Sequence, residues 1–244
     1  MNNKIKLGMP HLTYNGLDTI WLAKTLGDNH WNLLKDIKPF NIANQRLYAS
    51  FFACEINFNH GQNQFVENDM LKVDSKIFKF NNLIYRSCHT FSVRQNSASA
   101  TFDSIFVKKD IQTGALIKDE PSNPGKMIDT VDETFLEEHK KIKRELSTIN
   151  YDDFNELVFT PETYFNGVKI LYCANYMQLA LLNEFLTFKE ILNPIKKLKV
   201  YWFKNIEKED KVYGRTLQKD NAYETVLISN NKPIAFICTT RIEK

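Results

Sequence analysis

The chain contains the same short pattern twice, and this internal repeat constrains its fold more than any other feature. Residues 14–24 read YNGLDTIWLAK, and residues 165–175 read FNGVKILYCAN. Both stretches have an aromatic residue, an Asn-Gly pair and a branched aliphatic residue. Trp21 and Tyr172 keep the spacing of the two Asn-Gly pairs. Repetition at a fixed spacing indicates that one structural unit occurs twice.

The elements expected around the two Asn-Gly pairs follow the same order in both halves. A helical apolar period follows each pair, over residues 17–37 and 168–189. Alternating, aromatic-rich strands then follow, at 46–58, 69–80, 83–94 and 103–109 in the first half and at 197–206, 210–218, 222–229 and 233–242 in the second. Residues 155–164 read as one more strand before the second pair. This order predicts an α+β fold.

A long helix wrapped by a bent antiparallel sheet is the hot-dog arrangement. The second expected helix is apolar on most faces, which is typical of a buried helix. Two such units predict a double hot-dog fold, with two long helices that are each wrapped by a bent antiparallel sheet. We expect an N-terminal hot-dog domain at 1–112, a linker with a charged helix at 113–150 and a C-terminal hot-dog domain at 151–244. Another α+β domain with a duplicated unit would fit the same pattern.

Composition argues against several classes of protein. The net charge of +3 is too small to indicate nucleic-acid binding, and no run of about 18 apolar residues predicts a membrane span. The four cysteines form no CxxC pair, so we expect no metal site of the zinc type and no redox cofactor. The first residues lack the apolar segment of a signal peptide, which makes the cytoplasm the expected location.

The most specific sequence signal surrounds the first Asn-Gly pair. Residues 8–34 read GMPHLTYNGLDTIWLAKTLGDNHWNLL, residues 46–55 read RLYASFFACE, and residues 65–71 read FVENDML. These stretches resemble the LnmK-like family, the bifunctional acyltransferase/decarboxylases of polyketide biosynthesis. FNGVKILYCANY, at 165–176, is similar to the second hot-dog helix of that family.

The resemblance implies a double hot-dog enzyme that decarboxylates a malonyl- or methylmalonyl-CoA-type thioester and transfers the acyl group to an acyl carrier protein. The substrate would be a CoA or phosphopantetheine thioester, no separate cofactor would be needed, and the carrier protein would be the partner. The basic runs at 139–144 and 196–199 would suit an acidic carrier protein or the phosphates of CoA, although solvated surface lysines explain them equally well. The oligomeric state stays open, with a homodimer among the options.

Loss of CO2 from a malonyl thioester leaves an enolate, so the site needs hydrogen-bond donors at the thioester oxygen. The two Asn-Gly pairs precede helices whose first N–H groups offer such donors, although an Asn-Gly pair is also an ordinary turn. The second helix is favoured as the thioester pocket because it is more apolar. The substrate-binding candidates at these helices are Asn15, Gly16, Asn166, Gly167, Tyr172 and Asn175.

The catalytic candidates are Tyr48 and His89. Tyr48, in RLYASF, matches the acyl-accepting tyrosine that the resemblance implies. As a nucleophile it would need a base or a cationic neighbour, whereas as a hydrogen-bond donor to the enolate it needs neither. His89 could orient the thioester or shuttle a proton, but a strand histidine often serves structure alone. Glu67 and Asn68 are further substrate-binding candidates, since a carboxylate near the malonyl group would favour CO2 loss. Exposed loop acids are also common without any function.

Two other functions remain open at this point. A thioesterase on the same fold would need an acid that activates water, for which Glu67 and Asp69 are the candidates. A module that binds an acyl chain or a carrier protein without catalysis is the third option.

Overall fold

The computed structural model describes residues 1–35, 41–42, 45–80, 83–109, 116–118, 129–131, 133–148, 153–166 and 170–243. The first half contains the helix α1 (Thr19–Lys35), two single 3-10 turns, η1 (Met9–His11) and η2 (Gln62–Gln64), and the strands β1 (Asn2–Lys6), β2 (Leu12–Thr13), β3 (Gly16–Leu17), β4 (Asn41–Ile42), β5 (Gln45–Phe58), β6 (Met70–Lys79), β7 (Ile84–Val93), β8 (Asn96–Lys109) and β9 (Leu116–Lys118). After it come the helices α2 (Leu136–Leu146), α3 (Pro161–Tyr164) and α4 (Cys173–Phe188) and the strands β10 (Asn155–Leu157), β11 (Ile195–Trp202), β12 (Val212–Lys219), β13 (Ala222–Ser229) and β14 (Lys232–Arg241).

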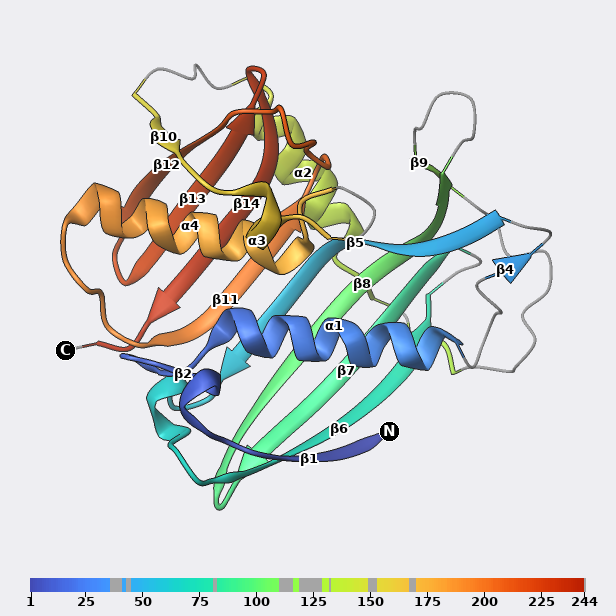
Figure 1. Cartoon of the computed structure of the whole chain (residues 1–244), viewed down its shortest axis with the longest axis vertical. Helices are drawn as coiled ribbons and strands as arrows, with labels where there is room; N and C mark the ends of the chain where they lie inside the picture. Colours follow the sequence, from blue (N-terminus) through green and yellow to red (C-terminus); the bar gives the residue numbers. More distant parts are fainter. Residues whose placement is uncertain are drawn as a thin grey trace.

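One large antiparallel sheet runs through both halves of the chain (Figure 1). Its main path has the order β1-β6-β7-β8-β5-β11-β14-β13-β12-β10. The halves join where β5 pairs with β11, from Ala53 opposite Tyr201 to Asn57 opposite Lys197. All named strand pairs are antiparallel.

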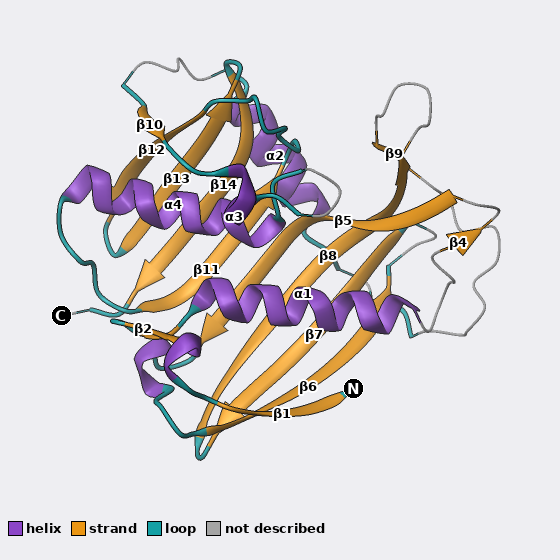
Figure 2. Cartoon of the chain, viewed as in Figure 1, coloured by secondary structure: helices purple, strands orange, loops and turns teal. Residues whose placement is uncertain are grey.

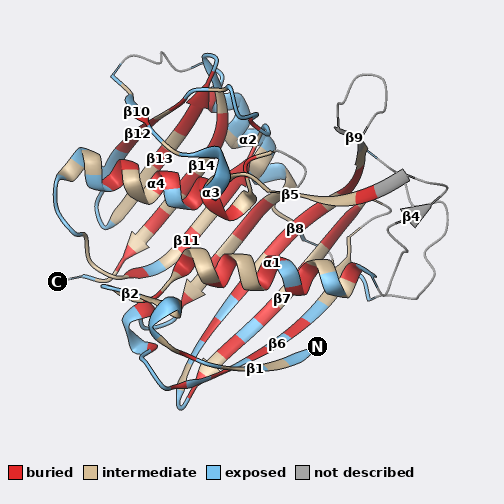
Figure 3. Cartoon of the chain, viewed as in Figure 1, coloured by how far each residue is buried: buried red, intermediate tan, exposed pale blue. Residues whose placement is uncertain are grey.

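The helices α1 and α4 lie on the same face of the sheet, each over the strands of its own half (Figure 2). Their buried residues face a shared apolar core that includes Leu22, Leu26, Met177 and Leu179 (Figure 3). The shorter α2 packs on the opposite face, because Lys199 and Tyr201 of β11 contact it while Val200, between them, lies in the core. The long helices α1 and α4 therefore cover one face of the sheet, and the shorter α2 packs on the other.

Both long helices begin later than the sequence pattern predicts. Residues 16 and 17 form β3, which pairs with β2, so α1 begins at Thr19 instead of residue 17. Asp18 caps it, since its Oδ1 accepts the N–H groups of Ile20 at 2.7 Å and Trp21 at 3.2 Å. The second helix begins at Cys173 instead of residue 168. Apolar residues continue at a helical spacing just before each helix begins. Periodicity alone therefore places the start of each helix too early.

The prediction of a continuous strand at 155–164 is wrong. Only Asn155–Leu157 form a strand, and Pro161–Tyr164 form the one-turn helix α3. Proline at the first position of a helix is favourable because it has no N–H to leave unpaired. In contrast, the charged helix expected within residues 113–150 does form, as α2.

The α+β class is confirmed by these elements. The division into two hot-dog domains with the boundaries 1–112, 113–150 and 151–244 stays a prediction. No helix in the described part of the chain is long and apolar enough to cross a membrane.

Candidate functional site

A cavity of about 380 Å³ opens at the N-terminal end of α4, and we call it the α4 cavity. This volume falls within the usual range of small-molecule sites. It lies between α4, the first half of β5 and the end of β11. Its lining residues are Tyr48, Ala49, Ser50, Phe51, Val107, Asn166, Ile170, Leu171, Tyr172, Cys173, Tyr176, Trp202, Asn205, Glu207, Lys208 and Glu209.

The start of α4 is fixed by hydrogen bonds to the segment that follows β11. Trp202 donates its indole N–H to the carbonyl oxygen of Cys173 at 3.1 Å, and Tyr176 donates its hydroxyl to the carbonyl of Lys204 at 3.0 Å. The N–H of Leu171 reaches the carbonyl of Ile206 at 3.3 Å. Aromatic residues with one polar atom suit this position, because the ring packs in the core while the polar atom finds a partner.

The first part of β5 forms the opposite wall because β5 is longer than its partner β11. The pairing between them ends with Tyr201 opposite Ala53, and β11 itself ends at Trp202. Tyr48 and Phe51 therefore lie beyond the end of β11, along an edge that β11 does not cover. The cavity occupies this place, where side chains from both halves of the chain meet.

The polar groups in the inner part of the cavity are protonated at neutral pH. Burial raises the pKa of the Tyr172 hydroxyl, and nearby Cys173 and Asp28 raise it further. Burial also raises the pKa of the Cys173 thiol to about 12, against the smaller opposing effect of backbone N–H groups at the helix start. A protonated thiol is a poor nucleophile, so the inner wall offers hydrogen-bond donors instead of nucleophilic anions.

Three of the predicted site residues meet in this cavity, namely Tyr48, Asn166 and Tyr172. The side chain of Asn166 accepts a hydrogen bond from the N–H of Ile170 at 3.3 Å. Gly167 falls outside the described residues. Asn175 does not line the cavity, since it is buried and donates its amide N–H to the carbonyl of Tyr164 at 2.6 Å.

The remaining predicted substrate-binding residues lie elsewhere, near the start of α1. Asn15, Gly16 and Glu67 line a separate open cavity of about 610 Å³ that excludes Tyr48. Asn68 follows Glu67 in an exposed turn with a positive φ of 67°. Asp69 is paired with Arg94 at 2.7 Å. The two Asn-Gly pairs therefore do not contribute to one common site.

His89 lies in a buried chain of hydrogen bonds beneath α1, and it does not line the α4 cavity. Its Nε2 contacts Ser87 Oγ at 2.8 Å and its Nδ1 contacts Ser75 Oγ at 2.8 Å. Ser87 Oγ also contacts His30 Nδ1 at 2.6 Å, and His30 Nε2 reaches Ser104 Oγ at 2.7 Å. This arrangement favours a structural role for the two histidines.

Burial keeps both histidines neutral. It lowers the pKa of His89 to about 3, with a smaller contribution from the N-terminal amine. It also lowers the pKa of His30 well below the usual value, and the proximity of His89 adds to this effect. A neutral imidazole has one donor and one acceptor nitrogen, so the serine hydroxyls can satisfy both rings.

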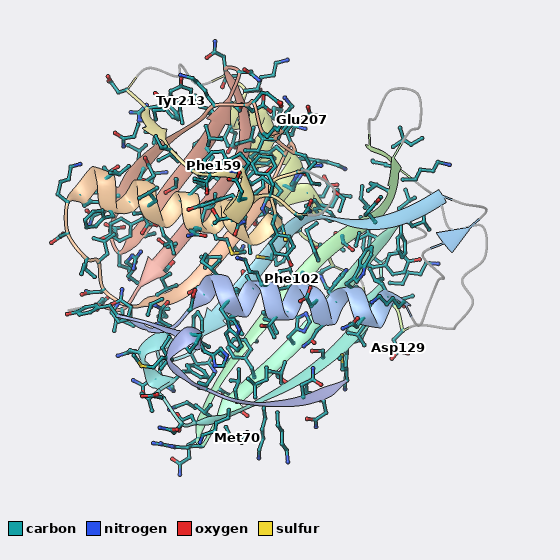
Figure 4. The ribbon with its side chains drawn as sticks, in the orientation of Figure 1. Met70, Phe102, Asp129, Phe159, Glu207 and Tyr213 are labelled. Carbon is teal, nitrogen blue, oxygen red and sulfur yellow. The ribbon has the colours of Figure 1, made fainter. Side chains whose placement is uncertain are left out.

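Sequence reasoning missed the residues that the end of β11 and the following loop contribute to the α4 cavity. Trp202, Asn205, Glu207 and Glu209 come from the end of β11 and the loop after it. Glu207 lies in the loop part of the C-terminal half (Figure 4). The signal was present as the charged run EKEDK, at 207–211, shortly after the aromatic strand expected at 197–206. Nothing in the sequence placed that run beside Tyr48.

The fold resembles that of solved acyl-thioester enzymes. The 12:0-ACP thioesterase from Umbellularia californica superposes with a TM-score of 0.72 and 9% identity, covering 98% of this chain and 96% of that one. An acyl-ACP thioesterase from Bacteroides thetaiotaomicron has a TM-score of 0.68 and 10% identity, with the same coverage of 98% and 96%. A MaoC-like dehydratase from Phytophthora capsici has a TM-score of 0.51 and 9% identity, over 80% and 72% of the two chains.

The chain has the hot-dog fold of these proteins. No family model and no curated protein sequence matches it. The resemblance to the LnmK-like family therefore stays a prediction. Identities near a tenth show a common fold and leave the reaction open.

Proposed function

We propose that the protein is an enzyme that acts on acyl thioesters bound in the α4 cavity. The observation that carries this proposal is the combination of apolar walls with two tyrosines, Tyr172 at the start of α4 and Tyr48 on the opposite wall formed by β5. Phe51, Val107 and Trp202 would surround the acyl chain, while Tyr48 and Tyr172 would face the thioester carbonyl. In this proposal the chain consists of two hot-dog units, and the cavity lies where the second helix meets the first unit.

Hydrolysis of the thioester is the reaction that we favour. Of the three solved structures described above, the two with the higher TM-scores are thioesterases. The exposed side chains of Glu207 and Glu209 also place two carboxylates at the rim of the cavity. One of them would take a proton from water as its oxygen attacks the carbonyl carbon. Tyr48 would donate a hydrogen bond from its hydroxyl to the developing oxyanion. The carbon–sulfur bond would then break, and the sulfur would leave as a thiol with the proton that the glutamate had taken from water.

Decarboxylation followed by acyl transfer is the second candidate, because Tyr48 lies on the cavity wall. In this reaction the bond to the malonyl carboxylate breaks, CO2 leaves, and the thioester enolate takes a proton. The thiol of a carrier protein would then attack the acyl carbonyl, the carbon–sulfur bond to CoA would break, and CoA would leave as a thiol with the proton of the attacking thiol. The Tyr48 hydroxyl would stabilise the enolate as a donor, a role that requires no base beside it.

The test is incubation of the purified protein with methylmalonyl-CoA and with a series of straight-chain acyl-CoAs, followed by mass spectrometry of all products. Free CoA with the matching acid indicates hydrolysis, whereas propionyl-CoA or a propionylated carrier protein indicates the second candidate. We expect Tyr48→Phe to lower kcat/KM by about 10²–10³-fold, the usual effect of removing one oxyanion donor.

Tyr213→Phe is the matched control, since Tyr213 is on β12 and well separated from Glu207 in the C-terminal half (Figure 4). It should retain full activity. Tight acyl-CoA binding with no turnover of any substrate would instead identify a binding module. Equal activity in Tyr48→Phe and the wild type would remove Tyr48 from the mechanism.

A further inference from the structure

A second cavity, of about 490 Å³, lies between α2 and the outer face of the sheet, and we call it the α2 groove. Its lining residues include Phe52, His139 and four lysines, Lys118, Lys140, Lys143 and Lys204. No aspartate or glutamate belongs to the described lining. Four ammonium groups around one groove without a lining carboxylate create a positive potential that attracts anions.

The positive charge of the α2 groove is only partly neutralised by its surroundings. Lys140 pairs with Glu137 at 2.7 Å, and both side chains are exposed, so this pair is weak. Among the described residues, no carboxylate pairs with Lys143 or Lys204. Burial lowers the pKa of His139, and the charge of Lys143 lowers it further. The lysines therefore supply the charge at neutral pH, while His139 donates its Nε2–H to the carbonyl of Trp202 at 2.9 Å.

The α2 groove and the α4 cavity are neighbours on opposite faces of the sheet. They share Ser50, Phe51, Trp202 and Asn205 as lining residues. Phe51 faces the inner side, where its ring packs on His30, and Phe52 faces the outer side, where its ring packs on His139. Both cavities thus meet at the place where β5 continues beyond the end of β11.

We propose that the α2 groove binds the phosphate of a pantetheine arm whose thioester end lies in the α4 cavity. This inference rests on the proposed function. It adds that the acyl group is attached to a phosphate-bearing pantetheine arm. An extended arm could pass the end of β11 and connect the two faces. Lysine ammonium groups bind phosphate as point charges. CoA and a holo carrier protein share this chemistry, because both carry a phosphate on the pantetheine.

The experiment is isothermal titration calorimetry of the full chain with four probes: CoA, 3′-dephospho-CoA, 4′-phosphopantetheine and pantetheine. We expect the phosphate-bearing probes to bind at least about tenfold more tightly than pantetheine. The variant Lys140→Gln/Lys143→Gln/Lys204→Gln should lose that advantage and bind pantetheine as the wild type does. A gain in affinity that already appears with 4′-phosphopantetheine supports the inference, because CoA and carrier proteins share this phosphate. A further gain from 3′-dephospho-CoA to CoA would identify CoA as the carrier, whereas a gain that appears only with the 3′-phosphate would overturn the inference.

The matched control is Lys4→Gln/Lys72→Gln/Lys76→Gln, which removes the same charge from exposed positions of β1 and β6. It should bind CoA within about twofold of the wild type. Equal affinity of the wild type for CoA and pantetheine, or equal loss in both triple variants, would overturn the inference. Turnover of acyl-pantetheine at the rate of acyl-CoA would overturn it too while leaving the proposed function intact. Neither binding nor turnover of any probe would reject both.

Discussion

At the scale of single residues, Gly16 shows why the first Asn-Gly pair is part of the fold. Its φ is +104°, a conformation that residues with a side chain rarely adopt. A Cβ at this position would lie 2.4 Å from the carbonyl oxygen of Gln62 and 2.5 Å from Cα of Asn63. Both are backbone atoms, so no side-chain rotation can make room. The requirement for glycine is thus explained by packing against η2.

We expect Gly16→Ala to lower the free energy of unfolding by at least about 2 kcal/mol, because it adds both backbone strain and a clash. Gly8→Ala is the control, since Gly8 has an extended φ of −133° and its nearest contact would be Pro10 Cδ at 3.9 Å. That change should alter stability by less than about 0.5 kcal/mol. Urea unfolding of the two variants measures the difference, and equal effects would contradict the strain at Gly16.

At the scale of elements, a buried ion pair connects α4 to the last strand. The Glu184 carboxylate accepts hydrogen bonds from Arg241 and from the Thr239 hydroxyl, the latter at 2.7 Å. Arg241 also donates to the carbonyl of Asn193. Burial raises the pKa of Glu184, whereas Arg241 and Thr239 lower it. The pair fixes the position of α4 against β14.

The substitution Glu184→Gln should lower the free energy of unfolding by about 3 kcal/mol, because it leaves the Arg241 guanidinium buried without a counter-charge. Glu156→Gln removes an ion pair with Lys211 in which both side chains are exposed. This second change should leave the free energy of unfolding nearly unchanged, because solvent screens the pair. Chemical denaturation of both variants measures the change in the free energy of unfolding. If Glu184→Gln lowers it as little as Glu156→Gln does, the buried ion pair contributes little to stability.

At the scale of the whole molecule, the sheet and its helices enclose titratable groups that only the folded chain keeps neutral. The folded-state pKa values of His30 and His89 lie below the value near 6.5 that an exposed histidine has. The unfolded chain therefore binds more protons than the folded chain as the pH falls below about 6.5. Folding stability must then decrease on acidification.

We expect the free energy of unfolding to fall by about 1.4 kcal/mol per pH unit for each of the two histidines between pH 6 and pH 4.5. The loss should stop for His89 near its folded pKa of about 3. Denaturant unfolding over this pH range measures the slope. His89→Gln should reduce it, and His60→Gln, at an exposed position, should not. A flat profile in the wild type would contradict the neutral buried network.

Local patterns in the sequence were sufficient to predict the repeat, the alternating strands and the two helical segments, and hence the α+β class. These features are local, since a period of two or of 3.6 residues is written in neighbouring positions. The sequence also selected Tyr48, Asn166 and Tyr172, which the fold brings together. It misplaced the helix starts and read α3 as a strand, because caps and one-turn helices give weak periodic signals.

Which of the candidate residues share a site follows from long-range contacts in the fold. Tyr48 meets Trp202 and Glu207 because β5 pairs with β11 and extends past its end. The same pairing separates Asn15, Gly16 and Glu67 from that cavity and leaves His89 buried under α1. Contacts between residues so distant in the chain depend on strand register and on how far each strand extends. No local pattern encodes these quantities, because register is selected by the packing of the complete sheet.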